Sequence, residues 1–261
     1  MGHTSESDNK PHTVSLTAYR IGETEVTQEL WEKVMGSNPS FFDNTGNKEQ
    51  WGDTFDTSHA TGEVQGKRPV ESVTWFQSIA FCNELTKKVM KLGADECVYY
   101  LKENDITVYT KEHAQAGKEP VQKLDKKGFR LPTEAEWEWA AKGGTNDKWA
   151  GTDDKSKLDE YAWYKANSEN KTHEVKKKTR NGYGLHDMSG NVWEWCWDWY
   201  DSLPDSVPAD YTGPASGFSR VGRGGSWYDD ADSAARAFRV FDGNPSIRGS
   251  SLGLRVAMSK N

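Results

Sequence analysis

Helical spacing of apolar residues and local capping signals predict three short helices. The apolar positions of residues 28–35 recur at helical spacing, and Gly36 is placed to end that helix. Thr74 is placed to cap a second helix of about 15 residues. Thr133 and Glu136 form a capping-box pattern, and a pair of glycines follows this third helix. The positions expected on the inward faces of the first two helices are Leu30, Trp31, Val34, Phe76, Ile79, Ala80, Asn83 and Leu85.

Alternation of apolar and polar residues predicts short strands. Residues 14–21 alternate well enough for one strand, and 98–101 and 106–109 predict a hairpin. The run 190–199 contains four tryptophans at every second position, which a strand directs to one face. Core packing is the favoured interpretation of these tryptophans, with a sugar- or choline-binding platform as the alternative.

The remaining stretches predict loops. Residues 37–68 are rich in Gly, Asn, Asp, Thr and Ser, which is typical of a long loop, and residues 111–127 form a charged, exposed stretch. Short helices early and short strands late predict an α+β fold with little regular secondary structure. Because there is no internal repeat and no convincing linker, we expect one domain over residues 1–261.

Composition narrows the class of partner. Hydrophobic residues make up only 34% of the chain, but 12 Trp, 10 Tyr and 9 Phe can still build a core. The net charge of −7 argues against nucleic acid and anionic membranes as ligands, since both attract basic surfaces. No apolar run approaches the roughly 20 residues that span a bilayer. The three cysteines, Cys82, Cys97 and Cys196, are interpreted as buried free thiols, with a Cys82–Cys97 disulfide as the alternative.

The C-terminal segment 223–257 differs in amino-acid composition from the rest of the chain. Glycines, Trp, Leu and Val at its two ends predict a rigid frame. Between them, residues 228–251 contain no Lys, Glu, Gln or Met, although Lys and Glu abound earlier. This contrast indicates a presented binding surface within a scaffold.

Four motifs give the chain a resemblance to formylglycine-generating enzymes, also called sulfatase-modifying factors. They are GFRLPTEAEWE at 128–138, GLHDMSGNVWEW at 184–195, RGGSW at 223–227 and GLRVA at 253–257. The resemblance extends back to residues 25–27 and 69–75, so it covers nearly the whole chain in order. It implies a C-type lectin-like fold of the formylglycine-generating-enzyme type.

The catalytic chemistry of that family is not expected here. The enzymes use two cysteines shortly after the Gly-Gly-Ser to hold copper, and those places fall on Asp229 and Ala234. A carboxylate or a methyl group cannot replace a thiolate as soft ligand and nucleophile. We therefore predict neither copper nor oxidase activity, with an enzyme of altered chemistry as the alternative.

The chain also resembles the variable proteins of diversity-generating retroelements, which use this scaffold. Their randomised segment lies between a Gly-Gly-Ser-Trp and a Gly-[Phe/Leu]-Arg ending. Template adenines in codons of AAC type are replaced by any base, and a codon ending in C never encodes Lys, Glu, Gln, Met or Trp. Those residue types are missing from residues 228–251. The resemblance implies a receptor-like protein with a hypervariable C-terminal binding surface.

This reading predicts a recognition surface of aromatic, small and acidic residues, the mix found in antibody loops. Its members are Tyr228, Asp229, Asp230, Asp232, Ser233, Val240, Phe241, Asp242, Gly243, Ser246, Ile247, Ser250 and Ser251. The expected partner is a protein or other macromolecule on another cell surface, with the aspartates favouring basic groups. We expect export and surface display, with an export signal or lipid anchor removed ahead of Met1. The alternatives are an ordinary surface loop over the core and an inert accessory domain of a larger assembly.

The resemblance also assigns structural roles. Arg236 and Arg239 match framework positions and are expected to form internal hydrogen bonds or ion pairs. Family positions matching Asp187, Gly190, Val192 and Glu194 bind calcium through two side-chain and two backbone oxygens, so a structural calcium is predicted there. The aspartates at 229, 230, 232 and 242 give a weaker alternative metal site.

Overall fold

The computed structural model describes residues 1–89, 93–204 and 206–260, apart from the side chains at 89 and 241–243. Its fold is α+β of the formylglycine-generating-enzyme type, as predicted. The helices are α1 (Gln28–Met35), η1 (Gln65–Lys67), α2 (Trp75–Val89), η2 (Ala94–Glu96), α3 (Lys111–Gln115), α4 (Glu134–Lys142), η3 (Lys155–Lys157) and α5 (Leu158–Tyr161). The strands are β1 (Tyr19–Ile21), β2 (Asn47–Gln50), β3 (Asp53–Asp56), β4 (Tyr99–Leu101), β5 (Pro120–Gln122), β6 (Phe129–Arg130), β7 (Trp193–Trp199), β8 (Arg220–Arg223), β9 (Arg239–Gly243), β10 (Leu252–Leu254) and β11 (Ala257–Ser259).

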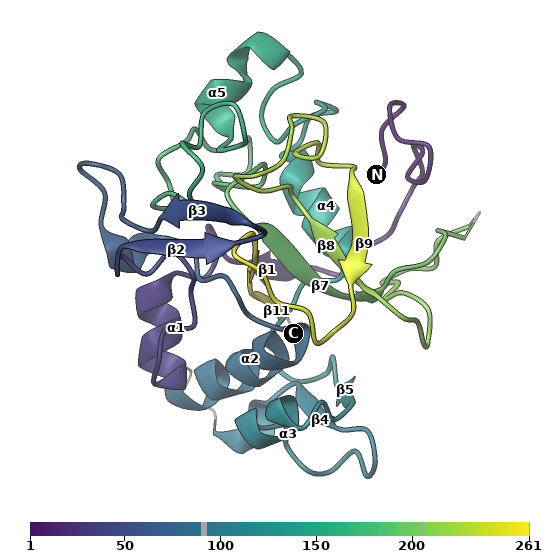
Figure 1. Ribbon diagram of the computed structural model, residues 1–261. Coiled ribbons are helices and arrows are strands. Elements are labelled where there is room, and N and C mark those ends of the chain that lie inside the picture. The colour runs from purple at the N-terminus through teal and green to yellow at the C-terminus, as the bar shows by residue number, and fades with distance from the viewer. Residues whose placement is uncertain (90–92, 205, 261) are drawn as a thin grey trace.

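Two sheets organise the centre of the molecule. The larger has the order β10-β7-β8-β9, in which β10 runs parallel to β7 and the other pairs are antiparallel. The second has the order β1-β11-β6 and joins the two ends of the chain. Helix α4 packs on β7 and β8, whereas α1, α2 and α3 gather at one end of the molecule (Figure 1). The C-terminal segment is therefore built into the central sheet.

The three predicted helices are confirmed as α1, α2 and α4. Their start and stop signals lie within a few residues of each helix end. Helix α1 ends at Gly36 in the left-handed conformation, with φ of 94°. Thr133 and Glu136 form the reciprocal capping box at the start of α4. The Thr74 hydroxyl accepts a hydrogen bond from the backbone N–H of Gln77, 3.1 Å away, at the start of α2.

Three loop and strand predictions need correction. Residues 37–68 are not one long loop, since they contain the β2–β3 hairpin and η1. Only the last three residues of the predicted strand 14–21 form β1. The stretch 111–127 contains α3 and β5, and β5 pairs with β4. Strands β2, β3 and β5 lack clear alternation of apolar and polar residues, so the sequence pattern did not predict their pairings.

Strand β7 is enclosed on both sides. Trp195 is buried in the main hydrophobic cluster, and its indole N–H donates to the Val73 carbonyl at 3.1 Å. On the other side, Glu194 and Asp198 are buried as well. All three cysteines are free and buried, so the alternative Cys82–Cys97 disulfide is wrong. Within the described residues, no helix is both long and apolar enough to cross a membrane.

Candidate ligand-binding site

A glycine turn starts the site. After β8 the chain turns through Gly224 and Gly225, with φ of 100° and 75°, values that L side chains rarely adopt. A Cβ on Gly225 would lie 2.7 Å from the Cα of Ala234. The turn therefore lets residues 226–235 fold back in close contact with the frame.

Trp227 anchors the folded-back segment. Its side chain is fully buried, and its ring lies edge-on to Phe42 and Phe55, with centroids 5.0 and 5.5 Å away. Its indole N–H donates to the Ser250 carbonyl at 2.9 Å. Trp227 thus joins the two ends of the segment 228–251.

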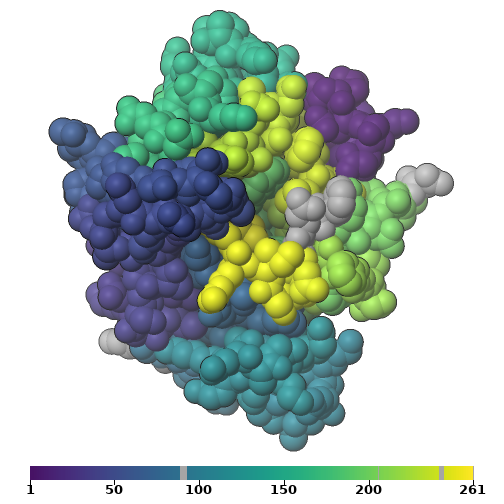
Figure 2. Space-filling view, in the orientation of Figure 1, coloured from purple at the N-terminus to yellow at the C-terminus, as the bar shows by residue number. Residues whose placement is uncertain are grey.

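Residues 244–251 are held against α2. The backbone N–H of Trp75 donates to the Pro245 carbonyl at 3.1 Å, and that of Ser72 donates to the Gly249 carbonyl at 2.9 Å. This loop and residues 226–235 consequently flank one hollow in the surface. In Figure 2 the hollow lies where the yellow C-terminal segment meets the dark-blue β2–β3 hairpin.

The hollow is a cavity of about 420 Å³. This volume lies in the range of small-ligand pockets, and several aromatic side chains line the cavity. Framework residues contribute Trp193 and Trp195 from β7, and Phe238 from the turn before β9. The predicted recognition residues that line it are Tyr228, Asp229, Ser233, Val240, Ile247 and Ser251.

Other predicted recognition residues lie elsewhere. Asp230, Asp232 and Ser246 are exposed but do not line this cavity, and Asp232 forms an ion pair with Lys148. Ser250 is fully buried, so its prediction as an exposed contact is wrong. The hydrogen bond from Trp227 to its carbonyl holds it inside. The side chains at Phe241, Asp242 and Gly243 lie outside the described part of the chain.

Trp51 is a wall residue that the sequence did not reveal. It sits at the tip of the β2–β3 hairpin with φ of 55°, and the residue is 54% exposed. Its ring lies 5.1 Å from that of Tyr228 and 6.4 Å from that of Trp227. The available signal was a single tryptophan in a polar loop. Packing alone brings it to a site more than 170 residues away in sequence.

The charges around the cavity are mixed. The Asp229 carboxylate accepts hydrogen bonds from the Trp193 indole at 2.8 Å and from the Ser226 hydroxyl, and burial raises its pKa. Arg220 lies between the rings of Trp75 and Trp199, and burial lowers its pKa to about 9. A ligand in the cavity therefore meets both an acid and a guanidinium.

Glu71 holds the backbone of two aromatic residues that pack beside Trp227. Its buried carboxylate accepts the backbone N–H groups of Phe41 and Phe42 at 3.0 and 2.8 Å. Burial raises the pKa of Glu71 from 4.5 to about 7. A pKa raised by folding stabilises the fold fully below pH 4.5, and this contribution is lost as the pH rises through 7.

We expect the contribution of Glu71 to the free energy of unfolding to fall as the pH rises from 5 to 8. The fall is at most about 1.4 kcal/mol per pH unit. Urea unfolding of the natural protein and of Glu71→Gln at each pH measures it as the difference between the two slopes. Equal slopes would show that Glu71 titrates alike in the folded and unfolded chains.

Both framework arginines are structural, as predicted. Arg236 donates to Glu138 at 3.0 Å, and Arg239 forms two hydrogen bonds with Glu134 at 2.6 and 2.9 Å. All four side chains are buried. The arginines fix the C-terminal segment to α4 and are not available to a ligand.

The predicted calcium ligands do not fit calcium as a set. Both Glu194 oxygens accept hydrogen bonds from Arg255, and one also accepts from the Trp137 indole. Asp187 keeps one buried oxygen without a partner, but its other oxygen accepts the Lys176 N–H at 2.9 Å. A guanidinium therefore stands where the ion would need the Glu194 carboxylate.

Calcium binding is tested by thermal unfolding in CaCl₂ and in EGTA. Because Arg255 already neutralises Glu194, we expect the two melting temperatures to agree within about 1 °C. A melting temperature that climbs with calcium concentration would restore the original prediction.

Asp229 and Ala234, the positions predicted to match the enzymes' copper cysteines, differ in surroundings. Asp229 lines the cavity, whereas Ala234 is fully buried next to Gly225. The thiols of Cys82, Cys97 and Cys196 are buried, and burial raises the pKa of each. None of them lies among the described residues lining the cavity.

Comparison with known proteins finds relatives that are similar to this chain over nearly its whole length. The chain is 49% identical to Treponema denticola variable protein 1, with a TM-score of 0.87 over 99% of this chain and 91% of that one. It is 32% identical to the chaperone protein LppX of Paenibacillus barcinonensis, over 98% of this chain and 86% of that protein. The formylglycine-generating enzyme of Streptomyces coelicolor is 28% identical over 98% of this chain and 83% of the enzyme.

These similarities confirm the predicted resemblance to a variable protein on a formylglycine-generating-enzyme scaffold. The family description, Sulfatase-modifying factor enzyme 1-like domain, matches residues 1–260. With the matched span covering nearly the whole sequence, the chain belongs to the sulfatase-modifying factor enzyme 1-like domain family.

Proposed function

We propose that this protein is a non-catalytic, receptor-like binding protein whose C-terminal cavity is diversified by a retroelement. The observation that carries the proposal is the lining of the cavity. There, residues predicted to be variable lie beside the buried framework side chains of Trp193 and Trp195. The 49% identity to a variable protein supports it, as does the absence of cysteines after Cys196. Export and surface display belong to the same proposal.

Natural sequence variation tests the diversification. The gene's last segment is sequenced from several isolates, together with neighbouring DNA that is searched for a reverse transcriptase and a template copy. We expect substitutions confined to residues 228–251, at codons where the template carries adenine. Identical segments in all isolates would favour the inert accessory domain.

A stability measurement tests the division between frame and surface. Tyr228 and Ile247 are 39% and 46% exposed. We expect the double variant Tyr228→Ala, Ile247→Ala to lose less than about 1.5 kcal/mol of unfolding free energy, because exposed substitutions cost little beyond the ring contacts of Tyr228. Urea unfolding measures the loss. A loss above about 3 kcal/mol would mean that these side chains belong to the core.

A display library tests the binding capacity itself. Tyr228, Ser233, Val240, Ile247 and Ser251 are randomised together and panned against lysozyme as a defined probe protein. A control library randomises five exposed positions in the loop after β4, residues 102–106. We expect binders from the first library only, and a loss of about tenfold or more in affinity on Trp51→Ala, since aromatic wall residues dominate such contacts. Equal enrichment from both libraries would contradict the proposal.

A further inference from the structure

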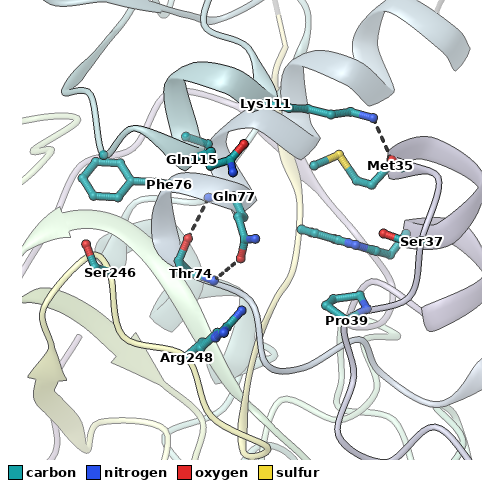
Figure 3. A pocket seen from close by; sticks show the side chains of 13 residues that line it. Met35, Ser37, Pro39, Thr74, Phe76, Gln77, Lys111, Gln115, Ser246 and Arg248 are labelled. Atoms are coloured by element: carbon teal, nitrogen blue, oxygen red, sulfur yellow. Dashed lines mark hydrogen bonds between the residues drawn. The ribbon is translucent and has the colours of Figure 1, made fainter.

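A second cavity lies beside the first and takes no part in the proposed function. It measures about 530 Å³ and is enclosed by α1, the start of α2, α3 and the loop 246–248 (Figure 3). Its floor contains the buried side chains of Trp31, Phe76 and Ala114, with Met35 and Pro39 beside them. It thus combines an apolar floor with a separate polar rim.

The rim is cationic. Lys111 and Arg248 line the cavity, together with the amides of Gln77 and Gln115, and none of the described lining residues is acidic. The Lys111 ammonium donates to the Met35 carbonyl at 2.8 Å, which uses one of its three donors. Thr74 caps α2 at the same rim, and the positive end of the helix dipole adds to the field.

Arg248 has unused hydrogen-bonding capacity. The side chain is exposed, and within the described part of the chain it has no ion pair or hydrogen bond. Figure 3 shows it extending from the C-terminal loop toward Thr74 and Gln77, on the side of the cavity facing Lys111. A guanidinium offers a planar fork of donors that matches a carboxylate.

The two cavities share one residue. Arg248 lines both, and Ile247 lines the first while Ser246 lines the second. The loop 246–248 is therefore the ridge between them. One extended ligand segment crossing this ridge contacts both cavities.

We propose that the second cavity binds an acidic peptide segment of a protein ligand, with one carboxylate on Arg248, another on Lys111 and an apolar side chain on the Trp31–Phe76 floor. Charge complementarity selects this occupant, because an anion gains from two cations and meets no acid on the described lining. The assignment extends the proposed function, but its test does not depend on it.

The probe is the N-acetylated, C-amidated peptide Asp-Leu-Glu-Phe, compared with its uncharged counterpart Asn-Leu-Gln-Phe. Isothermal titration measures affinity, and backbone amide shifts locate the site. We expect the acidic peptide to bind at least about tenfold more tightly, with an affinity that falls as salt rises. We expect Lys111→Gln and Arg248→Gln each to weaken it about fivefold or more. The matched controls Lys102→Gln and Arg180→Gln, both at exposed positions outside the lining, leave it unchanged.

Equal affinity for the two peptides, no binding at 5 mM, or equal effects of the control variants would overturn the assignment. The variant Tyr228→Ala, at a residue that lines only the first cavity, separates this inference from the proposed function, and it should keep its affinity for the acidic peptide. If only the library binders depend on Tyr228 and no acidic peptide binds, the first cavity stands alone. If the acidic peptide binds and isolates show no variation, the second cavity stands without diversification.

Discussion

Arg255→Met should lower the free energy of unfolding by about 3–5 kcal/mol, because it leaves a buried carboxylate without its counter-charge. Arg255 is fully buried, and its guanidinium contacts Glu194 at 2.7 Å. It also donates to the carbonyls of Gly22 and His186 at 3.0 and 2.9 Å. These contacts join the C-terminal end of the frame to β7 and to the N-terminal part of the chain. Thermal and urea unfolding measure the loss, which corresponds to a fall in melting temperature of about 10 °C.

The double variant Arg255→Met, Glu194→Gln is the internal control. It removes both charges but keeps an acceptor for the Trp137 indole. Because no uncompensated buried charge remains, we expect it to be more stable than Arg255→Met alone. If the double variant loses the sum of the two single losses, the pair does not act as a charge pair.

Trp227→Ala should also cost about 3–5 kcal/mol, because it opens a cavity at the centre of an aromatic cluster. The indole is fully buried and contacts Phe42, Phe55 and Trp51. The substitution also removes the donor to the Ser250 carbonyl. Loss of that bond should loosen residues 244–251, which hydrogen exchange of their amides can detect.

The matched control is Trp139→Ala on α4, where 42% of the tryptophan side chain is exposed. We expect it to cost less than about 1 kcal/mol, since exposed substitutions have small effects. Similar losses at the two tryptophans would mean that Trp227 is not an anchor of the site.

The large losses expected at the frame and the small ones expected at Tyr228 and Ile247 have one physical cause. Framework side chains are buried and satisfy several partners, so their removal leaves voids and unpaired groups. The two cavity residues keep a large part of their surface in water. We therefore expect the site to tolerate changes in its lining without losing the fold.

Local signals in the sequence were sufficient for α1, α2 and α4, and the resemblance to a known family was sufficient for the scaffold. Gly36 ends α1, and the Thr133–Glu136 capping box begins α4, because each depends on residues a few positions apart. The change in residue composition after Trp227 also predicted a separate ligand-contacting segment. Six of its predicted recognition residues line one cavity.

Only the tertiary structure decided which side chains face that cavity. Trp51 reaches the cavity from the tip of the polar β2–β3 hairpin. The two strands of this hairpin show no alternation of apolar and polar residues that would predict them. Ser250 turns inward because an indole 23 residues earlier binds its carbonyl. Glu194 is paired with a guanidinium 61 residues later rather than left free for an ion. Each outcome depends on contacts between distant segments, and a residue pattern within one segment contains no information about its partner.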